Sequence, residues 1–159
     1  MTRRTSLALI AGAILLAVAW LAATWELPVI AAGGLLHPIR RPVAQLPPAG
    51  CRDVAFTGVD VTLRGWRCRA VGERKATLVF LHGVADNRTS AAGMVPRYVN
   101  LGFEVIAYDS RAHGGSGGDA CTYGYWEKQD LNKVLDTVPA GPIVLLGGSL
   151  GAATQQRLY

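Results

Sequence analysis

The stretch IVLLGGSLG, Ile143 to Gly151, decides how the rest of this chain is interpreted. Its first four residues are all apolar, which is typical of a strand buried on both faces of a parallel sheet. The last five fit the pattern G-x-S-x-G with Ser149 at the centre, and a helix is expected to begin at Leu150. The stretch therefore predicts a sharp strand-to-helix turn that presents the Ser149 hydroxyl as a nucleophile.

Segments upstream of this turn alternate between strand and helix signals, which indicates an α/β fold with a mostly parallel sheet. A hairpin is predicted from strands at 52–57 and 61–70, with its turn around 58–60. Buried strands are predicted at 77–81 (TLVFL) and 103–108 (FEVIAY), and helices at 90–100, at 125–137 and from 150 onward. We therefore expect one α/β domain over residues 51–159.

Three motifs, taken in their order along the chain, resemble the α/β-hydrolase family. Leu81-His82-Gly83 ends a predicted strand, as the family's HG motif does before its oxyanion loop. The segment DSRAHGGSGG, 109–118, is similar to the family's D-x-R-G-H-G-x-S-x-G loop, with Ala112 in place of glycine, and 143–151 matches the nucleophile elbow. The similarity runs from about Val54 to Tyr159 and is closest to the membrane-anchored, serine-peptidase-like or acyl-esterase branch.

This resemblance implies a serine hydrolase that forms an acyl-enzyme on an ester, thioester or peptide bond. Ser149 would attack, and the backbone N–H groups of Val84 and Leu150 would bind the oxyanion. Asp109 is expected to cap its loop beside Arg111 rather than to act as the triad acid. The supporting positions that the resemblance implies are His82, Gly83, Asp109, Arg111, His113, Gly147 and Gly151.

The triad acid and histidine are expected to follow the serine along the chain in this family. No Asp, Glu or His occurs after Ser149, and the resemblance makes His82 and His113 braces of loops rather than bases. Because loss of the base lowers turnover about a millionfold in serine proteases, we expect the chain alone to be inactive. We interpret it as the N-terminal half of the fold, truncated after the elbow, where strand 143–146 would become an exposed edge. The alternatives are a non-catalytic anchored binding domain or a truncated remnant on a hydrolase scaffold.

An uncharged run of twenty residues, Ser6 to Trp25, follows a short N-terminal segment, 1–5. About twenty residues of helix span the hydrocarbon core of a bilayer, whereas a cleavable signal peptide has an apolar region of about 7 to 15 residues. We predict an uncleaved signal anchor at 6–25, with the cleavable signal peptide as the alternative and the lipid bilayer as a partner. Arg3 and Arg4 flank its start, which predicts an inside N-terminus and a globular part outside, in a periplasmic or extracytoplasmic space.

Prolines at 38, 42, 47 and 48 predict that residues 26–50 form a Pro-rich stalk between the anchor and the domain. The chain has three cysteines. If the predicted hairpin is centred between Val59 and Asp60, Cys51 and Cys68 face each other and a disulfide is geometrically possible. Free thiols at these two positions are an equal alternative.

Composition excludes several classes of protein. Half of the residues are apolar and 17% are charged, which excludes a disordered chain. The net charge is +5, but no run of basic residues interleaved with aromatics indicates a nucleic-acid surface. No Cys/His cluster has the spacing of a metal site, so neither a metal nor an organic cofactor is expected. The substrate is expected to be a small ester or a peptide, and the sequence does not indicate an oligomeric state.

Overall fold

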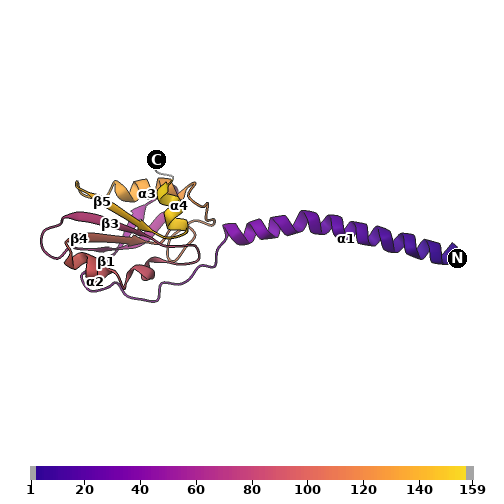
Figure 1. The fold of residues 1–159 in the computed structure, drawn as a ribbon, viewed down its shortest axis with the longest axis horizontal. Helices are drawn as coiled ribbons and strands as arrows, with labels where there is room; N and C mark the ends of the chain where they lie inside the picture. The colour runs from indigo at the N-terminus through magenta and orange to yellow at the C-terminus, as the bar shows by residue number, and fades with distance from the viewer. Residues whose placement is uncertain (1–2, 157–159) are drawn as a thin grey trace. The chain divides into compact units, whose positions relative to one another are not determined.

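The computed structural model describes residues 3–156, which divide into an N-terminal helix and a globular unit that starts at His37 (Figure 1). Residues 1–2, from the predicted N-terminal segment, and 157–159, from the end of the predicted hydrolase domain, lie outside the described residues.

The N-terminal helix, α1, runs from Arg3 to Leu36 and is longer than the predicted anchor. Its part from Leu9 to Leu36 is long and apolar enough to cross a membrane. The prediction ended at Trp25 because Glu26 is charged, but glutamate is a strong helix former and the residues after Pro28 are apolar again. The helix therefore continues through Glu26 and Pro28 into the segment that was expected to be stalk.

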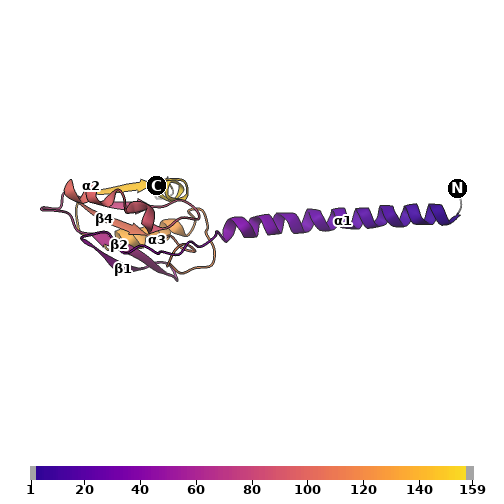
Figure 2. The same ribbon diagram turned by 90° about the horizontal axis from the view of Figure 1, so that it is seen from below.

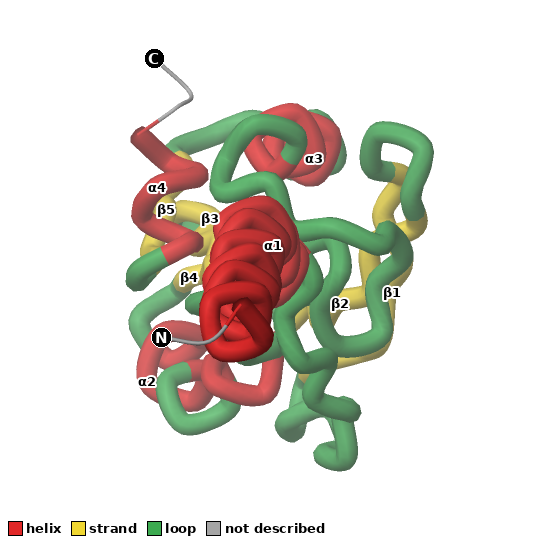
Figure 3. The backbone as a smooth tube through the Cα atoms, turned by 90° about the vertical axis from the view of Figure 1, so that its right-hand side faces the viewer, coloured by secondary structure: helices red, strands yellow, loops and turns green. Residues whose placement is uncertain are grey.

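A five-stranded mixed sheet forms the globular unit, in the order β1-β2-β4-β3-β5. Figures 2 and 3 show β1 and β5 at its opposite edges. Strands β3, β4 and β5 are parallel, as expected, whereas the β1–β2 hairpin joins the sheet through an antiparallel pairing of β2 with β4. The strands are β1 (Cys51–Thr57), β2 (Thr62–Cys68), β3 (Ala76–Leu81), β4 (Phe103–Tyr108) and β5 (Ile143–Gly147).

Helices cover both faces of the sheet (Figure 1). Helix α2 (Val95–Asn100) and the 3-10 helix η1 (Arg88–Ala91) pack with Trp66 and Leu78 on one face. Helix α3 (Glu127–Leu135) packs with Leu63 and Val79 on the other, where α4 (Leu150–Gln156) lies beside it.

The single helix predicted at 90–100 is wrong, because the structure divides this segment into η1 and α2. The Asn87 side chain accepts a hydrogen bond from the Thr89 backbone N–H and starts η1 earlier than expected. Pro96 lies in the first turn of α2, where a proline is tolerated because the N–H that it lacks would have no helical partner.

Strand β5 lies at an edge of the sheet, as expected for residues 143–146. Ile143, Val144 and Leu146 are all exposed there, although the sequence pattern is that of a strand buried on both faces. An apolar edge of this kind has unpaired backbone donors and acceptors and invites pairing with another strand.

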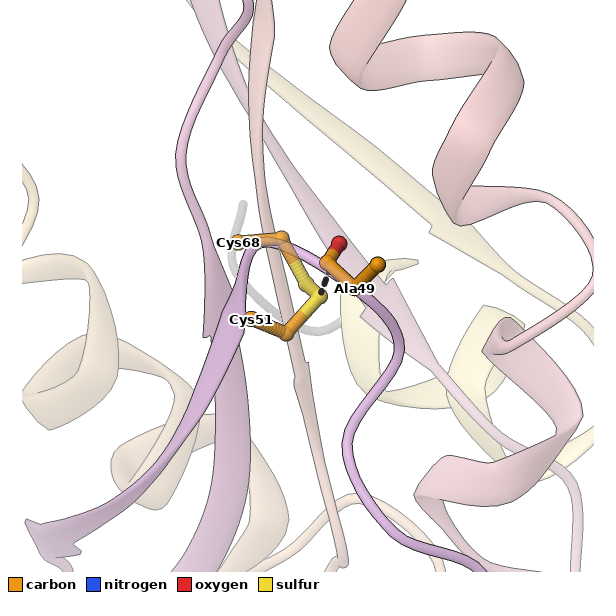
Figure 4. Close-up of a disulfide and its surroundings, with 3 residues drawn as sticks. All are labelled: Ala49, Cys51 and Cys68. Carbon is orange, nitrogen blue, oxygen red and sulfur yellow. Dashed lines mark hydrogen bonds between the residues drawn. A yellow bond between two sulfur atoms is a disulfide. The ribbon is translucent and has the colours of Figure 1, made fainter.

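A disulfide joins Cys51 to Cys68, which decides between the two alternatives left open by the sequence (Figure 4). The two cysteines face each other in the hairpin register, as do Phe56 and Leu63 further along it. Cys121 is free and buried, and burial raises the pKa of its thiol to about 11.

Residues 37–50 have little regular secondary structure but do not form a separate stalk. They lie against the globular unit: the Arg40 guanidinium donates to the Ser116 carbonyl, and Val43 packs against one of the two hydrophobic clusters of the core. The prolines predict only the conformation of the backbone. The contacts of the Arg40 and Val43 side chains hold the segment against the sheet and its loops.

Candidate active site

Ser149 occupies the sharp turn that the sequence predicted. Strand β5 ends at Gly147 and α4 begins at Leu150, so two residues reverse the direction of the chain. Ser149 has a φ of +52°, in the left-handed region, which costs an L-residue about 1 to 2 kcal/mol. Strained backbone of this kind is concentrated at functional sites, and the Ser149 residue is exposed to solvent.

The two glycines that flank this turn leave no room for a side chain. A Cβ at Gly151 would lie 2.2 Å from the Leu81 carbonyl oxygen, and one at Gly147 would lie 2.7 Å from the Gly151 carbonyl carbon. At Gly148, by contrast, a Cβ would meet nothing within 4 Å. The close packing of α4 on the ends of β5 and β3 therefore requires glycine at 147 and 151, as the pattern predicted.

The loop after β3 lies directly beside Ser149. A Cβ at Gly83 would be 3.6 Å from the Ser149 Cβ, so a side chain at 83 would take up space next to the hydroxyl. Val84 follows and is exposed. At the other side of the turn, Leu150 is the first residue of α4, so its backbone N–H has no partner within the helix.

His82 is held as a neutral ring by two hydrogen bonds. Its Nε2 accepts from the Ser110 backbone N–H at 2.9 Å, so the proton is on Nδ1, which lies 2.7 Å from the Gly83 carbonyl oxygen. Burial lowers the pKa of His82 below its usual value of 6.5, with a smaller contribution from the neighbouring His113. Because its only free lone pair is already used, His82 is a brace between two loops and not a base in this arrangement.

His113 is fully buried beside it, with the two ring centroids 5.1 Å apart in an edge-to-face arrangement. Its Nδ1 lies 2.8 Å from the Arg111 carbonyl oxygen, which places the donor proton on that nitrogen. Nε2 has no hydrogen-bond partner within residues 3–156. The His113 ring thus has no exposed surface, and its N–H donates within its own loop.

Asp109 caps the loop that follows β4, but its ionic partner was not predicted. Its carboxylate is fully buried, accepts from the Gly115 N–H at 2.8 Å and pairs with the Arg88 guanidinium at 2.5 Å. Asp109 is predicted to lie beside Arg111, whereas Arg111 pairs with Asp130 at 2.7 Å. No local pattern could have found Arg88, which is 21 residues away along the chain.

The structure thus brings most of the predicted site residues together. The elbow, the loop 82–84 and the loop 109–118 all follow the carboxyl ends of parallel strands. These strand ends lie together along one side of the sheet, across the ends of β4, β3 and β5. A cavity of 410 Å³ lies elsewhere, lined by Asp53, Val54, Ala55, Arg64 and Arg88, and does not include Ser149. In the described part of the chain, no group of three or more His, Cys, Asp or Glu side chains is arranged to hold a metal ion.

Comparisons with known proteins agree with this geometry. A sequence model of the alpha/beta hydrolase fold matches residues 76–158. The uncharacterized protein YqkD of Bacillus subtilis (strain 168) is 40% identical over 83 residues, which cover 49% of this chain and 27% of that protein. The structure of the Pyrococcus furiosus esterase Pf2001 aligns with a TM-score of 0.64 and 32% identity over 77% of this chain and 52% of the esterase.

The epoxide hydrolase VrEH1 from Vigna radiata shares the fold alone, with a TM-score of 0.60 and 16% identity over 72% of this chain and 35% of that one. The chain therefore spans about half the length of the similar esterase structure, and less of the other relatives. On the matched residues, their order and the geometry of the elbow, the chain belongs to the alpha/beta hydrolase fold family.

Proposed function

We propose that Ser149 is the nucleophile of a membrane-anchored serine hydrolase that cleaves acyl bonds, with esters ahead of thioesters and peptides. The observation that carries this proposal is the exposed serine at a φ of +52° in a turn that requires glycine at 147 and 151. A backbone that costs free energy to form and holds a hydroxyl in solvent is expected where the hydroxyl reacts.

The identity of the residue at the turn favours acyl substrates over epoxides. When a serine oxygen attacks a carbonyl carbon, the alcohol leaves and an acyl-enzyme forms, which water then hydrolyses at the same carbonyl. If the oxygen of Ser149 opened an epoxide, it would form an ether with no carbonyl for water to attack, and turnover would stop. The likeness to an esterase is therefore the better guide to the chemistry than the likeness to an epoxide hydrolase.

The oxyanion of the tetrahedral intermediate would accept hydrogen bonds from the backbone N–H groups of Val84 and Leu150. Leu150 opens α4, where the N–H has no helical partner, and Val84 follows the glycine that lies beside Ser149. Backbone donors suit this role because they are fixed before the substrate arrives.

The base that activates Ser149 is inferred to come from outside the described residues. The Nε2 lone pair of His82 accepts from Ser110, and His113 has no exposed surface. A general base must lie within about 3 Å of the hydroxyl that it deprotonates, and no hydrogen bond to the Ser149 hydroxyl is formed within the described chain. The triad acid and histidine are therefore proposed to belong to a further part of the protein.

Helix α1 is proposed to anchor the protein, with the globular unit on the extracytoplasmic side. The Leu9–Leu36 part is long and apolar enough for this, and Arg3 and Arg4 precede it. The Cys51–Cys68 disulfide supports an oxidising compartment for the globular unit, because disulfides persist there and are rare in the cytosol.

A fluorophosphonate probe, which reacts with activated serines, tests the nucleophile. Membranes that contain the native protein should show labelling that Ser149→Ala removes and that Ser90→Ala, at another exposed serine, leaves intact. Before the probe is added, the native protein should also hydrolyse p-nitrophenyl esters, whereas purified chain of these 159 residues should show negligible turnover. A native protein that the probe does not label would refute the serine mechanism and favour a non-catalytic binding domain.

A further inference from the structure

Residues 37–43, which we call the strap, are bound to the loop that follows β4. His37 Nδ1 donates to the Asp119 carbonyl oxygen at 2.7 Å. The Arg40 guanidinium donates to two carbonyls of the same loop, Ser116 and Gly118, the second at 2.6 Å. A planar fork on two acceptors fixes both the position and the orientation of the backbone that it holds.

The strap also reaches the loop that follows β3. The Asn87 side-chain amide donates to the Arg41 carbonyl oxygen at 3.2 Å, and the same Asn87 side chain starts η1. Val43 then packs against the hydrophobic cluster that contains Trp66. The strap is thus joined to both loops that lie at the Ser149 edge of the sheet.

The loop held by Arg40 has internal hydrogen bonds, such as the one from the Ala112 N–H to the Gly117 carbonyl, and a glycine-rich end. Four of its last five residues are glycines, at 114, 115, 117 and 118, and glycine has more conformational freedom to lose on ordering than any other residue. Gly114 and Gly118 have positive φ, as does Ala112. Contacts from outside the loop help to order such a segment: the Gly117 N–H donates to the Thr62 carbonyl oxygen, and the Arg40 fork supplies two further contacts at the glycine-rich end.

Hydrogen bonds and one peptide bond connect this loop to Gly83, beside Ser149. The Ser116 hydroxyl donates to the Asp109 carbonyl oxygen at 2.6 Å. The next residue, Ser110, donates its N–H to His82, and His82 in turn donates to the Gly83 carbonyl. Gly83 is the residue that lies beside Ser149.

We propose that Arg40 is a positioning residue of the active site, which holds the loop 109–118 so that His82 keeps Gly83 in place beside Ser149. The segment that links α1 to the globular unit is then part of the frame of the site. The assignment of a catalytic consequence rests on the proposed function of Ser149, but the connection between Arg40 and His82 does not.

The connection can be measured in the full chain, reconstituted in lipid nanodiscs, because it has only three histidines. With ¹⁵N-labelled histidine, the ring nitrogens of His82 report its tautomer and its titration directly. Arg40→Gln removes the fork. Arg41→Gln is the matched control. It removes the same charge at the next residue, but the Arg41 guanidinium forms no hydrogen bond to any described residue.

In the unchanged protein His82 should appear as the neutral Nδ1–H tautomer, protonated only below its usual pKa. With Arg40→Gln the His82 ring should titrate at higher pH, and the Ser110 amide should exchange with solvent about tenfold faster. Arg41→Gln should change neither. Equal changes in both variants, or none in Arg40→Gln, would overturn the proposal.

The catalytic consequence has a separate readout. The rate of Ser149 phosphonylation in the native protein should fall about 10- to 100-fold with Arg40→Gln and stay unchanged with Arg41→Gln. If phosphonylation is absent from the unchanged protein, the proposed function fails while the histidine spectra still decide the role of Arg40. If the spectra change but phosphonylation does not slow, Arg40 is not a positioning residue.

Discussion

Gly151→Ala tests how closely α4 must approach the sheet. The added Cβ would lie 2.2 Å from the Leu81 carbonyl oxygen, whereas real Cβ atoms essentially never come within 3.0 Å of another heavy atom outside their local chain. The helix and the strand must therefore separate by at least the difference of 0.8 Å. The strand cannot easily yield, because Leu81 pairs with Tyr108 on one side and with Gly147 on the other.

The free-energy change follows from three contributions. Overpacking of a tight site costs about 1 to 3 kcal/mol, and the loss of one ladder hydrogen bond adds about 1 kcal/mol. Alanine favours a helix over glycine by about 1 kcal/mol, which offsets part of this. The free energy of unfolding should therefore fall by about 1 to 3 kcal/mol, equivalent to a melting temperature lower by about 5 to 15 °C.

Urea unfolding of the purified chain, followed by near-ultraviolet circular dichroism, measures this change. Gly148→Ala is the matched control, because its Cβ meets nothing within 4 Å and it lies in the same turn; it should stay within about 0.5 kcal/mol of the unchanged protein. Equal stability of Gly151→Ala and Gly148→Ala would refute the inference that packing against Leu81 requires glycine at 151.

Three further predictions concern the core and the loops. Replacing Cys51 and Cys68 by alanine should lower the free energy of unfolding by about 3 kcal/mol, measured by denaturant titration. Asp130→Asn should cost about 3 kcal/mol or more by the same measurement, because it leaves the buried Arg111 guanidinium without its counter-charge. The lowered pKa of His82 means that the unfolded chain binds its proton first as the pH falls below about 6.5. Stability should therefore be full above that pH and fall below it, by up to about 1.4 kcal/mol per pH unit, and His82→Gln should remove this slope in unfolding titrations at pH 5 to 8.

Each of these has a control and a result that would contradict it. Reductant should lower the free energy of unfolding of the unchanged protein to that of the double cysteine variant. If neither the reductant nor the double substitution lowers it, the disulfide does not stabilise the fold by restricting the unfolded chain. Lys133→Gln, at an exposed position of the same helix as Asp130, should be neutral; an equal loss there would point to a general charge effect. His37→Gln should keep the fall of stability at low pH. If this fall disappeared in His37→Gln, its assignment to His82 would be wrong.

Local sequence determined much of this fold. The strand at 103–108 has the predicted bounds, and the hairpin register follows from its central turn, because each cross-strand pair is set once the turn is placed. The order of the three motifs also predicted which loops would meet at Ser149. Carboxyl ends of parallel strands lie at one edge of a sheet, so residues that follow those strands are brought together whatever the intervening sequence.

Only the tertiary structure decided which charges pair and where the segment before β1 lies. Asp109 pairs with Arg88 rather than with Arg111 of its own loop, because the loop turns its carboxylate toward the start of η1. In the same way, the prolines of 37–50 indicated an extended backbone but not that Arg40 would find two carbonyls of a glycine-rich loop. Strand and turn preferences are properties of neighbouring residues, and a sequence displays them; an ion pair or a clamp forms only between groups that the completed fold brings within about 3 Å of each other.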